Sequence, residues 1–235
     1  TKLTIFFTDH TSDNLLRVHA AAKEFFSEHP AKIDSGEFLM AGGAVGMEIA
    51  INEEMMRTHT MVDLMVLGTI FILCGLFYRS FLAGALLTGP LVLGNFVAFC
   101  YMAMNGIGLS INTLPVAAVG AGVGVDFAIY IYNRCKEEFD ALGANTGSAS
   151  LASDSDTWKR VVLTSVRTSG KAVLFTGLTM VLPILSWLVL SDLKFQAQMG
   201  MFLAMILTTN VLLALTLHPL MLYLIKPRFI SRGLG

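Results

Sequence analysis

Five long apolar segments limit the folds open to this chain more than any other feature. They run over about 61–78, 81–104, 111–132, 172–190 and 196–225. A helix needs about 20 residues to cross the ~30 Å hydrocarbon core of a bilayer, and each segment is close to that length or longer. Hydrophobic residues make up 54% of the chain and charged residues 14%, which also favours a membrane protein. The predicted fold class is an α-helical integral membrane protein with five transmembrane helices.

The first 60 residues are more polar and predict a small β-α-β unit. Residues 3–7 are rich in β-branched and aromatic side chains and predict a strand. Residues 37–41, which two glycines follow, predict a second strand. Between them, residues 11–13 offer N-cap oxygens for a helix that Pro30 stops. Such a unit is too small to bury a core alone, so we expect it to pack on protein outside this chain.

Two domains are therefore predicted. Residues 1–48 form the soluble unit and residues 49–235 form the transmembrane bundle. A helix that starts near Val45 is expected to run into the first span without a break. The chain opens on Thr1 with neither a start methionine nor a signal peptide, and we interpret it as a processed chain or a piece of a longer one.

A polar segment, residues 133–171, connects the third and fourth spans. Its part 141–156 is small and polar, which predicts a flexible linker. Its part 157–170 has helical periodicity, with apolar residues on one side and basic residues nearer the other. This part is interpreted either as an amphipathic helix on the membrane surface or as an ordinary cytosolic connector.

The distribution of basic residues predicts the orientation in the membrane. With residues 1–60 outside, the inner segments 79–80, 133–171 and 226–235 hold ten Lys and Arg residues, whereas the two short outer loops hold only Lys194. Residues 1–60 are therefore expected to be extracytoplasmic and the carboxyl terminus cytoplasmic. The net charge of −1 gives no sign of a nucleic-acid partner. The three isolated cysteines form neither a disulfide framework nor a zinc pattern, so no metal site is expected.

One carboxylate, Asp126, lies deep in the third span, within the stretch GAGVGVDFAIYIYNR. It follows Ile111 by fifteen residues, or about 22 Å along a helix. An Asp at the centre of a membrane helix costs about 2.5–3.5 kcal/mol, and charged residues at this depth usually face a bundle interior and mark ion or proton paths. Asp126 is therefore predicted to carry a proton inside the bundle. The alternative is an Asp held by hydrogen bonds that only fixes helix packing.

The neighbours of Asp126 extend this interpretation. Gly120, Gly122 and Gly124 form a run of small residues that lets another helix backbone approach closely. Tyr130 follows Asp126 by one turn on the same side of the helix. Thr176 in the fourth span has a similar depth, and it can exchange a hydrogen bond with Asp126 if the two helices are neighbours.

Other polar residues in the spans are expected to serve helix packing. Each of them is predicted to bond to its own helix backbone or to a neighbouring helix: Thr179, Thr208, Thr209 and Asn210. His218, which precedes Pro219, is predicted to lie at the inner interface.

These motifs resemble those of one transporter superfamily. Gly122–Asp126, followed by Tyr-Ile-Tyr-Asn-Arg at the end of the span, resembles the Gly-xxx-Asp signature of resistance–nodulation–division (RND) transporters. The resemblance is greatest to the lipid and hydrophobe exporters of this superfamily, which include the mycobacterial large membrane proteins. Residues 170–179 resemble the start of that family's eleventh helix, where Thr176 falls on a threonine of the proton relay. Residues 38–56 resemble the last porter-domain strand and the start of the eighth helix.

The resemblance implies that the five spans are helices 8 to 12 of a twelve-helix protein and that residues 1–60 end its second extracytoplasmic porter domain. It implies a secondary transporter of the bacterial inner membrane, not an enzyme, that exports lipids or other hydrophobic or amphiphilic molecules by proton antiport. Asp126, Tyr130 and Thr176 would form the proton relay, without a cofactor. The implied partners are the amino-terminal half of the same transporter, membrane lipids and a lipid-like substrate, and a homo-oligomer stays open. One departure is Phe127, because lipid exporters often have Tyr directly after this Asp.

Three other interpretations remain. Intramembrane aspartyl proteases need two deep carboxylates, whereas Asp63 and Asp192 lie at span ends and the motif order here is Gly-x-Gly-x-Asp. A non-transporting relative of sterol-sensing or receptor type, or a protein-translocation accessory subunit, shares the topology. A third is an accessory subunit whose relay no longer works. No phosphate-binding Gly-Lys-Ser/Thr loop is present in the sequence, so ATP is not the direct energy source within this chain.

Overall fold

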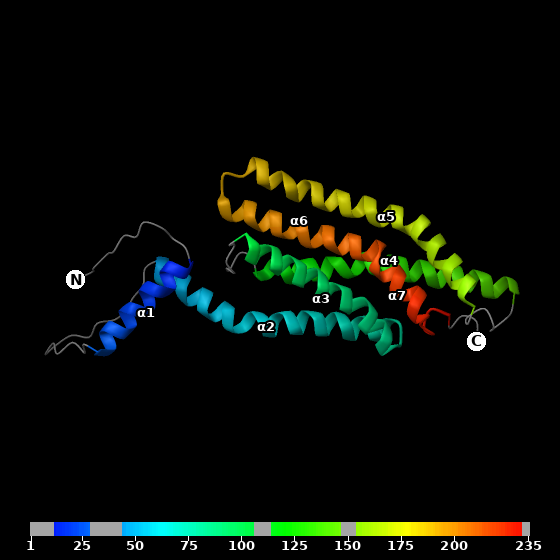
Figure 1. The fold of residues 1–235 in the computed structure, drawn as a ribbon, viewed down its shortest axis with the longest axis horizontal. Helices are drawn as coiled ribbons and strands as arrows, with labels where there is room; N and C mark the ends of the chain where they lie inside the picture. Colours follow the sequence, from blue (N-terminus) through cyan, green and yellow to red (C-terminus); the bar gives the residue numbers. More distant parts are fainter. Residues whose placement is uncertain (1–11, 29–43, 106–113, 147–153, 232–235) are drawn as a thin grey trace. The chain divides into compact units, whose positions relative to one another are not determined.

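A computed structural model represents the protein and describes residues 12–28, 44–105, 114–146 and 154–231. The chain forms two compact units, one of Thr1–Thr60 with Gly108–Ile111 and one of Met61–Ile107 with Asn112–Gly235. Every element in the described ranges is an α-helix (Figure 1), which confirms the helical fold class. The strands predicted at 3–7 and 37–41 lie outside the described residues.

The helices follow one another in chain order: α1 Ser12–Glu28, α2 Ala44–Phe77, α3 Phe81–Met104, α4 Leu114–Thr146, α5 Ser155–Leu190, α6 Lys194–Leu215 and α7 Leu217–Ile225. Among the described residues, five segments are long and apolar enough to cross a membrane: Arg57–Phe77, Phe81–Met104, Pro115–Leu142, Ser155–Leu190 and Gln196–Ile225. The prediction of five transmembrane helices is therefore confirmed. Helix α1 fills the place of the helix expected before Pro30, and α2 starts at Ala44 and enters the first span without a break, as the sequence predicts.

The turn between α2 and α3 is tight. Arg79 adopts the left-handed conformation with φ 49°, and the N–H of Ser80 donates to the carbonyl of Gly75 at 2.9 Å. This is the usual way in which a helix end satisfies its last carbonyls. Helix α3 then returns so close to α2 that a Cβ atom on Gly84 would lie 2.7 Å from the carbonyl oxygen of Phe71.

Helices α4 and α5 are longer than the sequence predicts. Residues 141–146, expected in a flexible linker, belong to α4. Residues 157–170 are the first part of α5, which runs from Ser155 to Leu190 without interruption. Outside the apolar part, Phe139 of α4 and Trp158 of α5 pack with their ring centroids 4.4 Å apart, and both are fully buried. This aromatic contact explains why both helices continue beyond their spans.

Asp154 caps the first turn of α5. Its carboxylate accepts hydrogen bonds from Thr157 Oγ1 at 2.7 Å and from the Thr157 N–H at 2.9 Å. These bonds, and weaker contributions that include the backbone of Asp156 and the charge of Lys226, hold the pKa of Asp154 below its usual range.

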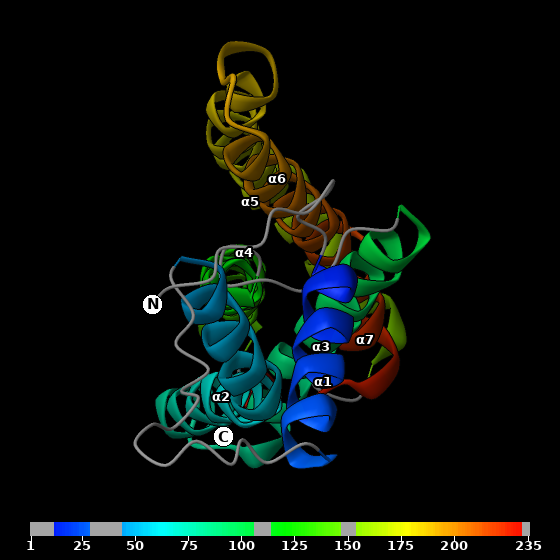
Figure 2. The same ribbon diagram turned by 90° about the vertical axis from the view of Figure 1, so that its left-hand side faces the viewer.

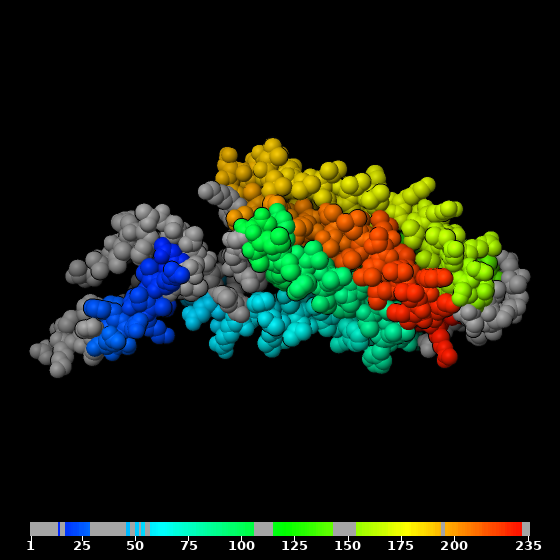
Figure 3. Space-filling model, in the orientation of Figure 1, coloured from blue at the N-terminus to red at the C-terminus, as the bar shows by residue number. Residues whose placement is uncertain are grey.

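The last predicted span is broken into α6 and α7 at Thr216. Pro219 has no N–H to donate to the carbonyl four residues earlier, so the regular hydrogen-bond pattern ends there. Helices α5 and α6 lie side by side in both ribbon views (Figures 1 and 2). In Figure 3, α6 and α7 (orange to red) fill the band between α5 (yellow) and α3 (green). Helices α3 to α7 thus form one packed bundle.

Candidate functional site

Asp126 lies on the exposed side of α4. Exposed residues recur there at intervals of three and four, and they form what we call the α4 stripe: Pro115, Val119, Gly122, Asp126 and Tyr130. This spacing places them on one side of a helix. Within the described residues, the five spans therefore do not enclose Asp126, because the other side of α4 packs against α3, α5 and α6. Its expected position inside a larger bundle stays a prediction.

The two predicted relay partners of Asp126 have different surroundings. Tyr130 belongs to the α4 stripe and is 56% exposed. Thr176 is half-buried on α5, a helix that packs against α4. Within the described ranges, no hydrogen bond joins Asp126 to either hydroxyl. Tyr130 thus lies on the same side of α4 as Asp126, whereas Thr176 makes no hydrogen bond to Asp126 or Tyr130 among the described residues.

Phe127 points to the packed side of α4. Its side chain is 1% exposed and belongs to the hydrophobic core together with Ala128 and Ile131. A tyrosine at position 127 would begin on this packed side and not on the α4 stripe. The presence of Phe127 in place of a tyrosine therefore does not change the surroundings of Asp126 on the α4 stripe.

The three glycines before Asp126 divide between the two sides of α4. A Cβ atom on Gly120 would lie 2.4 Å from Ile206 Cγ2, and one on Gly124 would lie 2.2 Å from Asn210 Nδ2. At Gly122, none of the residues that the structure describes lies within 4 Å of such an atom. Gly120 and Gly124 thus allow α6 to approach α4 closely, whereas Gly122 lies on the exposed stripe.

Asn210 of α6 occupies the place where three helices meet. Its side chain is 3% exposed, and its Nδ2 donates to the carbonyl of Gly120 at 3.0 Å. Its Oδ1 would lie 2.5 Å from a Cβ atom on Gly94 of α3, and this oxygen has no hydrogen-bond partner among the described residues. Asn210 thus bonds to a neighbouring helix, one of the two alternatives that the sequence leaves open, and it fixes the position of α4 next to α3 and α6.

The other polar residues of the spans mostly bond to their own helices. Thr179 Oγ1 donates to the carbonyl of Thr176 at 2.8 Å, and Thr208 Oγ1 donates to the carbonyl of Ala204 at 2.7 Å. These two bonds agree with the expectation that such residues satisfy their own helix backbone.

A second polar cluster lies at the end of the bundle where α2 ends and α7 begins. We call it the aromatic cluster: Tyr78, Tyr132, His218 and Phe229. The Tyr78 hydroxyl donates to Asn133 Oδ1 at 2.7 Å, and His218 Nδ1 lies 3.4 Å from the Tyr132 hydroxyl. His218 is only 2% exposed, so its ring is buried among protein side chains, and its position near the inner interface stays a prediction. Its ring packs edge-on against Tyr132 with centroids 5.6 Å apart, which buries it.

The five apolar helices of spanning length in the described residues, four of them packed in the α3–α7 bundle, define a multi-pass α-helical membrane protein. A comparison with models of protein families matches residues 40–232 to the MMPL family. The chain belongs to this family of RND-type membrane transporters, which agrees with the resemblance and fits a role other than catalysis. The comparisons with curated proteins and with solved structures gave no match.

Proposed function

We propose that this chain is the carboxyl-terminal part of a proton-driven exporter of lipids or other hydrophobic or amphiphilic molecules, with Asp126 as the proton carrier. The position of Asp126 on the α4 stripe is the observation that supports this proposal most. Asp126 follows Pro115, the first residue of the span, by eleven residues, which is about 16 Å along the helix. An Asp at this depth costs about 2.5–3.5 kcal/mol, so another protein surface or an aqueous cavity has to cover it.

The proposed cover is the amino-terminal half of the same transporter. Gly122 in the middle of the α4 stripe leaves room for a second helix to approach closely, and no described residue lies within 4 Å of a Cβ atom built there. Asp126 and Tyr130 would then face protein instead of lipid. A cysteine introduced at Val119 and labelled with a photoreactive cross-linker should, on illumination, form a cross-link with the other half of the full-length protein. The absence of any such cross-link from labelled positions along the stripe would contradict this arrangement.

Proton binding would change which arrangement of this interface is favoured. Burial of a neutral carboxyl group costs far less than burial of a carboxylate. A protonated Asp126 therefore tolerates a closed, dry interface, whereas the ionised form requires water or a cation next to it. Tyr130 on the same stripe and Thr176 on α5 are the proposed hydrogen-bonding partners that pass the proton on.

The proposed location is the bacterial inner membrane, with residues 1–60 extracytoplasmic and the carboxyl terminus cytoplasmic. The excess of Lys and Arg in the segments assigned to the inner side supports this orientation. A reporter that is active only in the cytoplasm, fused after residue 235, should be active. An active periplasmic reporter at the same place would reverse the orientation.

The test of the proposed function replaces Asp126 with asparagine in the full-length protein. Asn cannot carry a proton but has nearly the same volume, so folding should be retained while lipid export driven by an imposed proton gradient falls to background. Asp192→Asn is the matched control, because Asp192 is exposed in the connection between α5 and α6 and its loss should leave export unchanged. Export at the wild-type rate by Asp126→Asn would exclude Asp126 as the carrier.

A further inference from the structure

Helix α5 carries a row of unneutralised positive charge next to its membrane span. We call it the α5 basic row: Lys159, Arg160, Arg167 and Lys171. All four side chains are exposed. In the parts of the chain that the structure describes, none of them forms an ion pair. Arg134 at the same end of the bundle differs, because it binds Glu137 at 2.9 Å and also binds Glu138. The charge of the basic row is thus available to a ligand.

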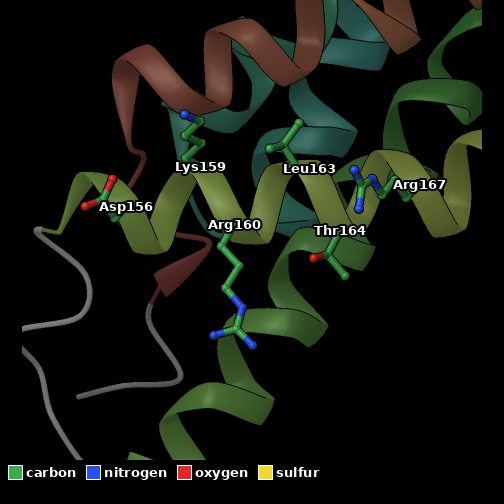
Figure 4. Close-up of a pocket in the computed structure, with 6 residues that line it drawn as sticks. All are labelled: Asp156, Lys159, Arg160, Leu163, Thr164 and Arg167. Carbon is green, nitrogen blue, oxygen red and sulfur yellow. The ribbon is translucent and has the colours of Figure 1, made fainter.

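The row borders a hollow on the surface of α5. The hollow has a volume of about 410 Å³, and six residues of this helix line it: Asp156, Lys159, Arg160, Leu163, Thr164 and Arg167 (Figure 4). They are spaced by three and four residues and therefore share one side of α5. The opposite side is buried, with Trp158 against Phe139 of α4. This packing keeps the basic row turned away from the bundle.

The continuity of α5 identifies the kind of partner. Lys171 is followed by the apolar residues 172–190 of the same uninterrupted helix, which at 1.5 Å per residue span about 28 Å, the thickness of the hydrocarbon core. Lys171 therefore lies at the boundary with the headgroups, and Arg167 lies one turn beyond it, about 6 Å further. Clusters of four or more basic residues directly beside a membrane helix attract anionic lipids. Leu163 is 50% exposed between the cations, and an apolar side chain there suits a lipid surface better than a free anion.

We propose that the α5 basic row binds the headgroups of anionic phospholipids. The contributions differ along the row, because a headgroup layer is only about 5–8 Å deep on each side of the membrane. Arg167 and Lys171 reach the phosphates directly. Lys159 lies about 18 Å from Lys171 along the helix, and its attraction is weakened by salt over a Debye length of about 8–10 Å.

The test measures lipid preference by native mass spectrometry of the protein in detergent with equal amounts of phosphatidylglycerol and phosphatidylcholine. Arg167→Gln and Lys171→Gln should each lower the ratio of bound phosphatidylglycerol to phosphatidylcholine about fivefold, whereas Lys159→Gln should lower it less. Lys23→Gln is the control, because Lys23 is an exposed cation on α1, outside the five spans, and it should leave the ratio unchanged. Thermal unfolding of each variant shows that it is folded.

Three results would overturn the proposal. The first is an unchanged ratio in the variant that has glutamine at all four positions of the row. The second is displacement of phosphatidylglycerol by an equal concentration of inorganic phosphate, which would make the hollow a site for free anions. The third is row-dependent binding of polyglutamate with an unchanged lipid ratio, which would indicate an acidic protein as the partner. None of these results depends on transport by the full-length protein, so each is independent of the role of Asp126.

Discussion

The contact between Gly124 and Asn210 can be tested by a single added methyl group. In Gly124→Ala, the new Cβ atom would lie 2.2 Å from Asn210 Nδ2 and 2.9 Å from Leu91 Cδ2. Favourable contacts between such atoms need about 3.5–4.0 Å, so Asn210 has to move by more than about 1 Å. That movement breaks its hydrogen bond to the carbonyl of Gly120, which is now 3.0 Å long.

The expected loss of stability has two parts. An extra methyl group in a well-packed core costs about 1–3 kcal/mol. The hydrogen bond between membrane helices adds about 0.6–1.7 kcal/mol. The free energy of unfolding should therefore fall by about 2–4 kcal/mol. In a chain of this size, 1 kcal/mol shifts the unfolding temperature by about 2–4 °C, which gives a decrease on the order of 5–10 °C for Gly124→Ala.

The measurement is thermal unfolding of the purified chain in detergent, followed by circular dichroism. Gly122→Ala is the control, because a methyl group there meets no described residue within 4 Å. Ala also has a higher helix propensity than Gly, so Gly122→Ala should not lower the unfolding temperature. Asn210→Ala should recover part of the loss when it is combined with Gly124→Ala, since the clash partner is then gone. Equal unfolding temperatures for Gly124→Ala and Gly122→Ala would refute the close approach of α6 to α4.

Three further predictions concern the ends of the bundle. His218→Ala should lower the free energy of unfolding by about 2–3 kcal/mol, because it leaves a cavity in the aromatic cluster, and chemical denaturation in mixed micelles measures this loss. Tyr78→Phe removes the hydrogen bond to Asn133 Oδ1 and should cost about 0.5–1.5 kcal/mol; a cost that persists when Asn133 is replaced by alanine would show that the bond is not its source. The pKa of Asp154 is depressed by its bonds from Thr157, so its stabilisation of α5 is complete above the unfolded-state pKa and is lost as the pH falls through the folded-state pKa. The measurement is thermal unfolding from about pH 6 down to about pH 3, the range in which carboxylates titrate. The unfolding temperature should fall less on acidification in Asp154→Asn than in the wild type.

Much of the helical architecture follows from the sequence by hydropathy alone. The five spans, the first helix and the continuous helix from residue 44 all match segments whose composition or caps predict them. The extensions of α4 and α5 could not be predicted in the same way. They depend on the burial of Phe139 against Trp158, a contact between residues nineteen positions apart in the sequence. A small, polar composition at 141–146 favours a linker only when such a contact is absent.

The candidate site was predictable in part. The depth of Asp126 and its shared side with Tyr130 follow from helical spacing. Helical spacing does not predict whether this side of α4 faces the bundle or is exposed, because that depends on how the neighbouring helices pack. The sequence did not predict that Gly94 of α3 lies against a polar side chain, because that contact depends on Asn210, a residue of another helix. The burial of His218 could not be predicted, because it comes from the ring of Tyr132, a residue of another helix.

The unbroken length of α5 has a mechanical consequence. Its 36 residues extend about 54 Å, well beyond the ~30 Å of hydrocarbon that a span has to cross. A change of about 10° in the tilt of the span would move Lys159, about 18 Å outside the apolar part, sideways by about 3 Å. That displacement is the length of a hydrogen bond. A rigid α5 would therefore act as a lever arm, in which a small rotation inside the membrane changes contacts at the outer end of the helix.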